Sequence, residues 1–244
     1  QPFMGSYTGM PQQEEYRILN YNGNTSLFGV IGVEGELDHV IVSDARITGT
    51  GQKRSSVLTE VNQGMIMNCA IERAVIYSAS ATDAALLSVE NSGVIDRCRA
   101  HGSVYTYGNM AGGSVYNDQR MIRTKVEAEL NLSAADQVTG GEELYVGGIA
   151  AVNGQTAFID ACESHGMIQA SGILQAPARL YLGGIVGKNA GQVRDGGALG
   201  QFPLEYTNNL IGDARGGMIA GENDGMITGV TYYETIGRKS SAAG

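Results

Sequence analysis

The sequence predicts an all-β fold, a parallel β-helix (solenoid) of about seven coils, and three observations support this prediction. A short phrase rich in Gly and Asn recurs in about seven imperfect copies, of which residues 183–193 are the clearest. The Asn residues that anchor successive copies lie about 26 to 36 residues apart, a spacing typical of solenoids. The units contain short apolar segments without a helical period, which favours strands.

Each unit is expected to contain two or three short strands. In the clearest copy, residues 180–186 predict a strand and residues 188–191 a turn, because Asn and Gly adopt left-handed backbone angles at little cost. A second strand is expected after the turn, as in residues 65–71, and a third as in residues 74–77 or 166–169. Leucine-rich repeats are excluded because their Leu spacing is absent, and a propeller is excluded because its blades need about 40 or more residues.

The repeat argues for one elongated unit, although a chain of 244 residues could hold two ordinary domains. We assign residues 22–236 to the β-helix, residues 1–21 to an N-terminal cap and residues 237–244 to a C-terminal tail or linker. A cap is expected because the open end of a solenoid exposes unpaired strand edges.

Composition and motifs exclude several functions. The net charge of -9 and the pI near 4.8 argue against nucleic acid and against a polybasic contact with a membrane surface. No run of about 18 apolar residues occurs, so membrane insertion is not expected. P-loop, HExxH, Gly-x-Ser-x-Gly and calcium-binding repeat motifs are absent, and we predict no catalytic, cofactor-binding or metal-binding residues.

The apolar residue that closes each phrase sets a register for the coils. These residues are Leu37, Ile66, Ile95, Ile122, Ile159, Val193 and Ile227. The residues three positions later are Val40, Cys69, Cys98, Lys125, Cys162, Gly196 and Val230. All three cysteines therefore share one position, which we interpret as an inward row of small apolar side chains in preference to a metal or redox site. A disulfide between Cys69 and Cys98 stays open at this point, since neighbouring coils could bring them together.

The residues one position after the closing apolar residue predict a row of charges. They are Asp38, Met67, Asp96, Arg123, Asp160, Arg194 and Thr228. The alternation of Asp and Arg predicts exposed ion pairs between neighbouring coils, each contributing only a few tenths of a kcal/mol. The alternative, an acid/base pair of Asp96 and Asp160, is disfavoured because Arg123 would lie between them.

Three further groups of residues are candidates for binding a ligand or a metal ion. The Asn anchors at positions 62, 91, 117, 153, 189 and 223 are expected to form a hydrogen-bonded ladder along the rod, in preference to binding a ligand. His101 and His165 share a repeat position, with Ala128 expected in the coil between them, so zinc is disfavoured. Tyrosines could stack on sugars or anchor a protein, although covering strand faces is the simpler role. Those noted are Tyr105, Tyr107, Tyr116, Tyr181, Tyr206, Tyr232 and Tyr233.

The repeated phrase resembles a known family. Gly-Gly-Ile-Val-Gly-Lys-Asn-Ala-Gly-Gln-Val at 183–193, Asn-Ser-Gly-Val-Ile-Asp-Arg-Cys at 91–98 and Asn-Asp-Gly-Met-Ile at 223–227 are similar to the GLUG repeat of secreted bacterial surface proteins. The resemblance spans roughly residues 27–233 and implies a right-handed parallel β-helix, an exported location and a role in attachment. Three copies depart from the phrase. The first lacks the Asn, the copy at 113–122 has Gln119 or Arg120 in place of Gly, and the copy at 148–159 carries two extra residues.

These observations predict a non-catalytic, extracellular or bacterial cell-surface module for adhesion. Its expected partner is a protein or glycan of a host or a neighbouring cell, bound through the side of the β-helix. Two alternatives remain, a structural spacer or assembly subunit that self-associates, and a polysaccharide-active β-helix enzyme. The enzyme hypothesis rests on the fold alone, because other parallel β-helices act on polysaccharides.

Overall fold

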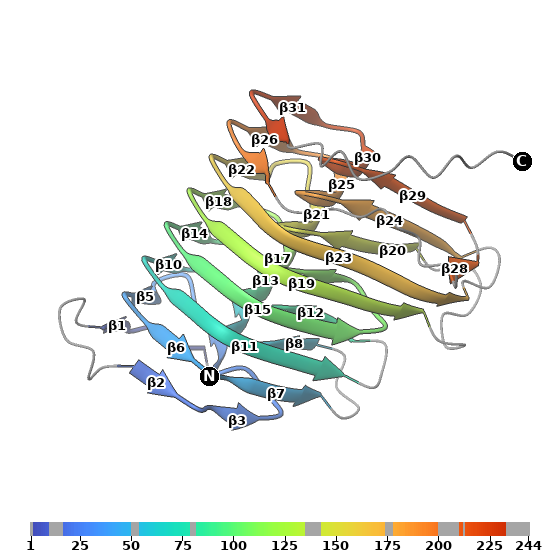
Figure 1. The fold of residues 1–244 in the computed structure, drawn as a ribbon. Helices are drawn as coiled ribbons and strands as arrows, with labels where there is room; N and C mark the ends of the chain where they lie inside the picture. The colour runs from blue at the N-terminus through green and yellow to red at the C-terminus, as the bar shows by residue number, and fades with distance from the viewer. Residues whose placement is uncertain are drawn as a thin grey trace, which may run out of the picture.

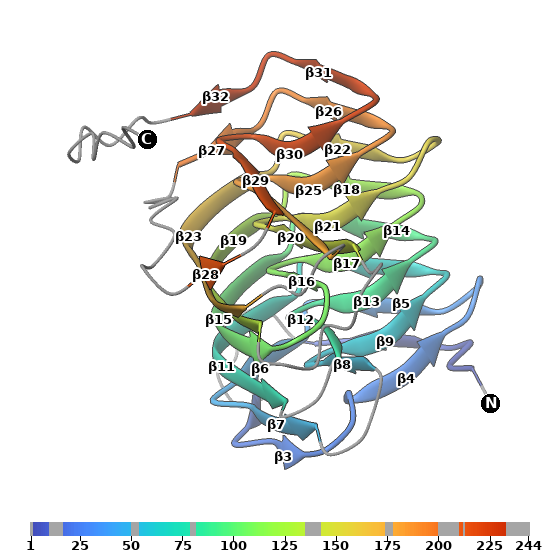
Figure 2. The same cartoon turned by 90° about the vertical axis from the view of Figure 1, so that its right-hand side faces the viewer.

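The computed structural model describes residues 2–9, 17–49, 54–78, 82–134, 143–173, 178–199, 210–211 and 213–232. Every regular element in this part of the chain is a strand, and all strand pairs are parallel. Four sheets run side by side along a rod (Figures 1 and 2). With the N-terminal coils at the bottom of Figure 1, one sheet crosses the front from left to right as the chain rises, so the coil is right-handed. The predicted parallel β-helix is confirmed.

Each coil passes through the four sheets in the order I, II, III, IV. Sheet I contains β1 (Ser6–Thr8), β5 (Glu36–Asp38), β10 (Met65–Met67), β14 (Val94–Asp96), β18 (Arg120–Ile122), β22 (Phe158–Asp160), β26 (Gln192–Arg194) and β31 (Met226–Thr228). Sheet II contains β2 (Arg17–Leu19), β3 (Asn22–Gly23), β6 (Ile41–Ser43), β7 (Arg46–Gly49), β11 (Ala70–Ser78), β15 (Arg99–Thr106), β19 (Lys125–Ala134), β23 (Glu163–Ile173), β27 (Gly197–Ala198), β28 (Leu210–Ile211) and β32 (Thr231–Tyr232).

The other two sheets complete the coil. Sheet III contains β8 (Arg54–Ser56), β12 (Asp83–Ala85), β16 (Met110–Ala111), β20 (Glu143–Gly147), β24 (Arg179–Gly183) and β29 (Asp213–Gly217). Sheet IV contains β4 (Phe28–Ile31), β9 (Thr59–Asn62), β13 (Ser88–Asn91), β17 (Ser114–Asn117), β21 (Ala150–Asn153), β25 (Val186–Asn189) and β30 (Ala220–Asn223).

The first strands of the rod lie within the segment that was predicted to be an N-terminal cap. β1 and β2 fall within the segment predicted as a cap, where they are the edge strands of sheets I and II and pair with β5 and β6. Residues 10–16 and the predicted tail, residues 237–244, lie outside the described residues. The limits at residues 22 and 236 therefore stay predictions.

The predicted register is confirmed in six coils and wrong by one residue in the fourth. Met121 pairs with Ile95 and Ile159, whereas Ile122 pairs with Asp96 and Asp160. Both Met121 and Ile122 are apolar, so composition does not distinguish them. Their distance from Asn117 does, because Met121 keeps the four-residue spacing found between Asn91 and Ile95.

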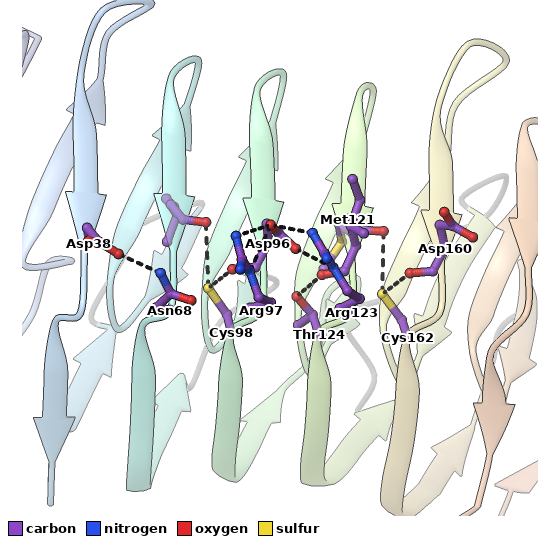
Figure 3. Close-up of polar contacts among 12 residues, drawn as sticks. Asp38, Asn68, Asp96, Arg97, Cys98, Met121, Arg123, Thr124, Asp160 and Cys162 are labelled. Carbon is purple, nitrogen blue, oxygen red and sulfur yellow. Dashed lines mark hydrogen bonds and ion pairs between the residues drawn. The ribbon is translucent and has the colours of Figure 1, made fainter. Parts of the chain in front are cut away.

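This shift places Thr124, not Lys125, in the row of the cysteines, which is buried as predicted. The thiols of Cys69, Cys98 and Cys162 each contact the carbonyl oxygen two residues earlier, at 3.2, 3.4 and 3.5 Å. The Thr124 hydroxyl donates to the equivalent oxygen of Ile122 at 3.1 Å. In four coils the row therefore has a small side chain that donates to the backbone two residues earlier (Figure 3), while Val40, Gly196 and Val230 complete it without a donor.

The predicted turn at residues 188–191 is confirmed for Ala190 and Gly191, which bend between β25 and β26, and is wrong for the two residues before them. Lys188 and Asn189 lie within β25, and the left-handed residues lie at the corner between sheets I and II instead. One residue per coil there has a φ between 47° and 64°. They are His39, Asn68, Arg97, Arg123, Ala161, Asp195 and Gly229. Only the last is Gly. His39, Asn68 and Asp195 are of types that tolerate this conformation, whereas Arg97, Arg123 and Ala161 adopt it at a cost in free energy.

The Asn anchors form a buried ladder, as predicted. Each side-chain nitrogen donates to the side-chain oxygen of the next Asn, at 2.8 Å from Asn62 to Asn189 and at 2.7 Å from Asn189 to Asn223. The first coil has Ile31 in this row, where the sequence lacks the Asn. The ladder satisfies polar groups that burial would otherwise leave unpaired.

Sheets III and IV meet at a sharp corner, which breaks the predicted strand 180–186 into β24 and β25. An added Cβ at Gly183 would overlap with the carbonyl oxygen of Val186, and one at Gly147 with that of Ala150. In these later coils the backbone lies too close for a side chain, so Gly is needed at this position. Ala85 and Ala111 take the same place in earlier coils and pack in a small second apolar cluster.

Sheet II changes along the rod. Its first three coils bend at left-handed residues Asn20, Asp44 and Arg73, and the pairing of β11 with β15 shifts at this point. The next three strands are continuous and long, with 8, 10 and 11 residues in β15, β19 and β23. These strands form the broad front face of Figure 1.

Candidate functional site

The outer face of sheet II carries the candidate site. Along β11, β15, β19 and β23, alternate residues point inward, and Ile76, Val104, Leu130 and Ile168 fill the core. The residues between them point outward, so equivalent side chains of successive coils form rows along the rod. Three depressions open on this face.

The first depression lies over a row of tyrosine and amide side chains. Tyr77, Tyr105, Asn131 and Gln169 are paired residues of four successive coils. Tyr77 and Tyr105 are 52% and 37% exposed, and their ring centroids lie 6.4 Å apart at an interplanar angle of 45°. The depression has a volume of about 410 Å³ and also touches Tyr107 and Ser171.

The second depression is charged. It has a volume of about 400 Å³ and lies over the row His101, Glu127 and His165, which are paired residues. The predicted shared position of the two histidines is confirmed, but the coil between them contributes Glu127, not Ala128, because of the one-residue shift at Met121. Nε2 of His165 lies 3.0 Å from the carboxylate of Glu163.

The third depression, of about 210 Å³, continues the charged surface toward sheet I. It is lined by Glu72, Arg99, Lys125 and Glu127, among others. Lys125 Nζ lies 3.9 Å from Glu163. The three depressions together make one band across sheet II, with an uncharged part at the ends of the strands and a charged part nearer their beginnings.

The charged side chains at the corner between sheets I and II form ion pairs with one another. The guanidinium of Arg123 donates to both carboxylate oxygens of Asp96 at 3.0 and 2.8 Å, and Arg97 adds a bond of 3.1 Å (Figure 3). Arg194 contacts Asp160 at 3.1 Å. The predicted pairing is therefore confirmed, while the predicted exposure is wrong for Asp96, whose side chain is only 10% exposed beneath the two guanidinium groups.

Arg123 contacts Asp96 from a different position than predicted. It lies two residues after the closing apolar residue of its coil, in the left-handed position, and Ile122 takes the place between Asp96 and Asp160. Asn68 makes an equivalent contact at the same corner, donating to Asp38 at 2.8 Å. Each of these aspartates is thus bound by a residue of the following coil. We therefore interpret the charged residues of this corner as structural.

The cysteines are buried and free, and no disulfide joins Cys69 to Cys98. Burial raises the pKa of the Cys98 thiol well above its ordinary value and that of Cys162 to about 12. Both therefore stay protonated and unreactive at neutral pH. Among the described residues, no three His, Cys, Asp or Glu side chains lie together as a metal ion would require.

The predicted tyrosines have two different environments. Tyr105 and Tyr107 line the first depression, whereas Tyr116 and Tyr181 pack on the outside of sheets III and IV. Tyr116 donates to Asp83 at 2.7 Å, and Tyr181 stacks on Tyr145 with centroids 5.2 Å apart. Tyr232 ends the last described coil, and Tyr206 and Tyr233 lie outside the described residues.

Sequence reasoning missed three members of the first depression. From the sequence, Tyr77, Asn131 and Gln169 were not identified as binding residues, because these residue types are common on the outer face of strands. A signal was available for Gln169, which lies seven residues after Cys162 just as Tyr105 lies seven after Cys98. The same count reaches Asn131 only from Thr124, and it misses Tyr77, because the register shift in β11 places Tyr77 eight residues after Cys69.

No protein-family model, curated protein or solved structure matches this chain. The resemblance to the GLUG repeat therefore stays a prediction. The described part of the chain contains no helix that is long and apolar enough to cross a membrane.

Proposed function

We propose that this chain is a non-catalytic attachment module of a bacterial surface or secreted protein, and that it binds its partner through the outer face of sheet II. The partner is a protein or glycan of a host or a neighbouring cell. The observation that carries the proposal is the alignment of three depressions on this one face, with exposed Tyr77 and Tyr105 among their lining.

The rigidity of the rod supports this role. The backbone ladders and the Asn ladder fix the outward rows in one geometry, so binding orders few groups that were mobile before. Tyr contributes a large contact area at a low cost in side-chain entropy, which suits a residue that anchors a partner. The acidic chain favours a partner other than nucleic acid.

The proposal is tested by attachment of the purified chain to intact cells. Wild type is compared with the double variant Tyr77→Ala and Tyr105→Ala, by flow cytometry on a panel of bacterial and animal cells. We expect the double variant to lose most of the attachment. Tyr7→Ala is the matched control, because Tyr7 is 43% exposed on β1 in sheet I. Attachment that persists in the double variant would contradict the assignment of sheet II as the binding face. A wild-type chain that attaches to none of the cells would contradict the attachment role and favour the spacer or assembly role.

A polysaccharide-active enzyme is the second candidate. It is favoured by the row of His101, Glu127 and His165, which places two imidazoles beside one carboxylate in a depression on the same face. Release of reducing ends from a polysaccharide, lost in Glu127→Gln, would support it. Such activity would replace the non-catalytic proposal.

A further inference from the structure

The first depression has a chemical character unlike the rest of this acidic surface. Of its lining side chains, none is charged at neutral pH, whereas the second depression contains Glu127 and Glu129. The groups that line it are phenol rings, carboxamides and hydroxyls. A ligand that fits here must therefore offer both apolar faces and uncharged hydrogen-bonding groups.

The polar groups of this row are available to a ligand. Within the described part of the chain, the carboxamide of Asn131 and the hydroxyls of Tyr77 and Tyr105 have no hydrogen-bond partner. Asn117, in the buried ladder of the same coil, instead donates to both Asn153 and Phe158. Gln169 donates from its nitrogen to the sulfur of Met167 at 3.2 Å and keeps its oxygen as an acceptor. Thus the carboxamide of Asn117 is used in hydrogen bonds within the fold, whereas that of Asn131 is available to a ligand.

We infer that the Tyr77–Tyr105–Asn131–Gln169 row binds a neutral oligosaccharide whose chain lies parallel to the rod axis, an inference that rests on the proposed function. A carboxamide presents a donor and an acceptor side by side, which matches two adjacent sugar hydroxyls. A tyrosine ring packs against the apolar C–H face of a sugar, and its hydroxyl remains free to bond. Successive coils lie about 4.8 Å apart, close to the advance per residue of an extended glycan.

The row also sets the direction of the ligand. Tyr77 and Tyr105 offer exposed rings at one end, and Asn131 and Gln169 offer amides at the other. A chain that crosses all four coils would stack near Tyr77 and Tyr105 and hydrogen-bond near Gln169. An anionic oligosaccharide would gain nothing from this uncharged lining and would be repelled by the net charge of -9.

Isothermal titration calorimetry of the full chain tests this inference. The probes are cello-, xylo- and manno-oligosaccharides of increasing length, with oligogalacturonate as the charged comparison. We expect binding of a neutral series, with affinity that rises until the oligosaccharide spans the four coils and is then constant. Tyr105→Ala and Asn131→Ala should each weaken binding about ten-fold, Tyr105→Phe should weaken it less, and Tyr7→Ala should leave it unchanged. Circular dichroism establishes that each variant is folded.

Three results would overturn the inference. They are the absence of binding to every neutral series, a preference for oligogalacturonate, or equal binding by wild type and Tyr105→Ala. The attachment role is judged separately. If cell attachment is lost in the tyrosine variants but survives enzymatic removal of cell-surface glycans, the ligand is a protein, and only the oligosaccharide assignment fails.

Discussion

The side-chain nitrogen of Asn91 donates to the side-chain oxygen of Asn117 at 2.8 Å, in the centre of a ladder that crosses six coils. Both side chains are fully buried. The nitrogens of the first five Asn residues also donate to a backbone oxygen of the next coil, as Asn91 does to Arg120 at 3.1 Å. The ladder therefore joins neighbouring coils twice at every step.

Replacing a central member of the ladder should destabilise the rod. Asn117→Ala leaves the side-chain oxygen of Asn153 without its donor and removes the acceptor of Asn91. Each buried polar group left unpaired costs about 1–3 kcal/mol. Asn223→Ala, at the exposed last member, is the control and should cost less. Urea unfolding followed by circular dichroism measures both, and an equal loss in the two variants would argue against the ladder.

The corner between sheets III and IV should not tolerate a side chain at Gly183, although earlier coils have Ala85 and Ala111 at this position. Gly183→Ala places a Cβ against the carbonyl oxygen of Val186, so the backbone must move, at a cost of about 1–3 kcal/mol. Gly29→Ala in β4 is the matched control, because its Cβ meets nothing within 4 Å. The control should be neutral or stabilising by up to about 1 kcal/mol. Thermal unfolding compares them, and an undisturbed Gly183→Ala would show that the corner is looser than described.

Relief of the left-handed conformation should stabilise the chain. Ala161 has a φ of 52° and is exposed, so its methyl group contributes little to packing. Ala161→Gly should raise the free energy of unfolding by about 0.5–1 kcal/mol, since the left-handed conformation costs Ala about 1–2 kcal/mol and Gly is more flexible when unfolded. Ala70→Gly within β11 should have the opposite sign. Chemical denaturation gives both values, and a loss of stability in Ala161→Gly would contradict the assigned backbone.

The buried thiol of Cys162 should make stability depend on alkaline pH. Burial raises its pKa from 9.0 to about 12 in the folded chain, so the folded state keeps a proton that the unfolded state loses. Stability from this group is complete below pH 9.0 and is lost as the pH rises toward about 12. Cys162→Val, a residue type found in the same row at Val40, removes this dependence. Parallel pH profiles of wild type and variant between these limits would refute the buried thiol.

The repeated phrase predicted the coil because its apolar and Asn positions recur in both sequence and space. Leu37, Ile66 and Ile95 lie in one pairing row, as counted. The count failed at Ile122 because two adjacent apolar residues each satisfy the pattern, and only the pairing of Met121 with Ile95 separates them. That one-residue error also hid Glu127 between the two histidines.

The candidate site was harder to predict because its members are outward residues of ordinary types. The side chain of Asn117 points into the core and that of Asn131 points outward, and residue type alone does not distinguish the two. The left-handed conformation at the corner between sheets I and II was not predicted either. Residues such as Arg123 and Ala161 adopt it there because the coil must turn, although their types do not favour it. Local preference would have assigned it to Asn or Gly.

The most direct test of the central claim maps the bound ligand by nuclear magnetic resonance on the isotope-labelled chain. A neutral oligosaccharide selected by calorimetry is titrated, and the backbone amide shifts are followed. We predict that shifts concentrate at Tyr77, Tyr105, Asn131 and Gln169, while the outward residues of sheet IV, such as Val61 and Val152, stay unchanged. Shifts that gather on sheet IV, on sheet III or at the ends of the rod would contradict the claim that sheet II is the binding face.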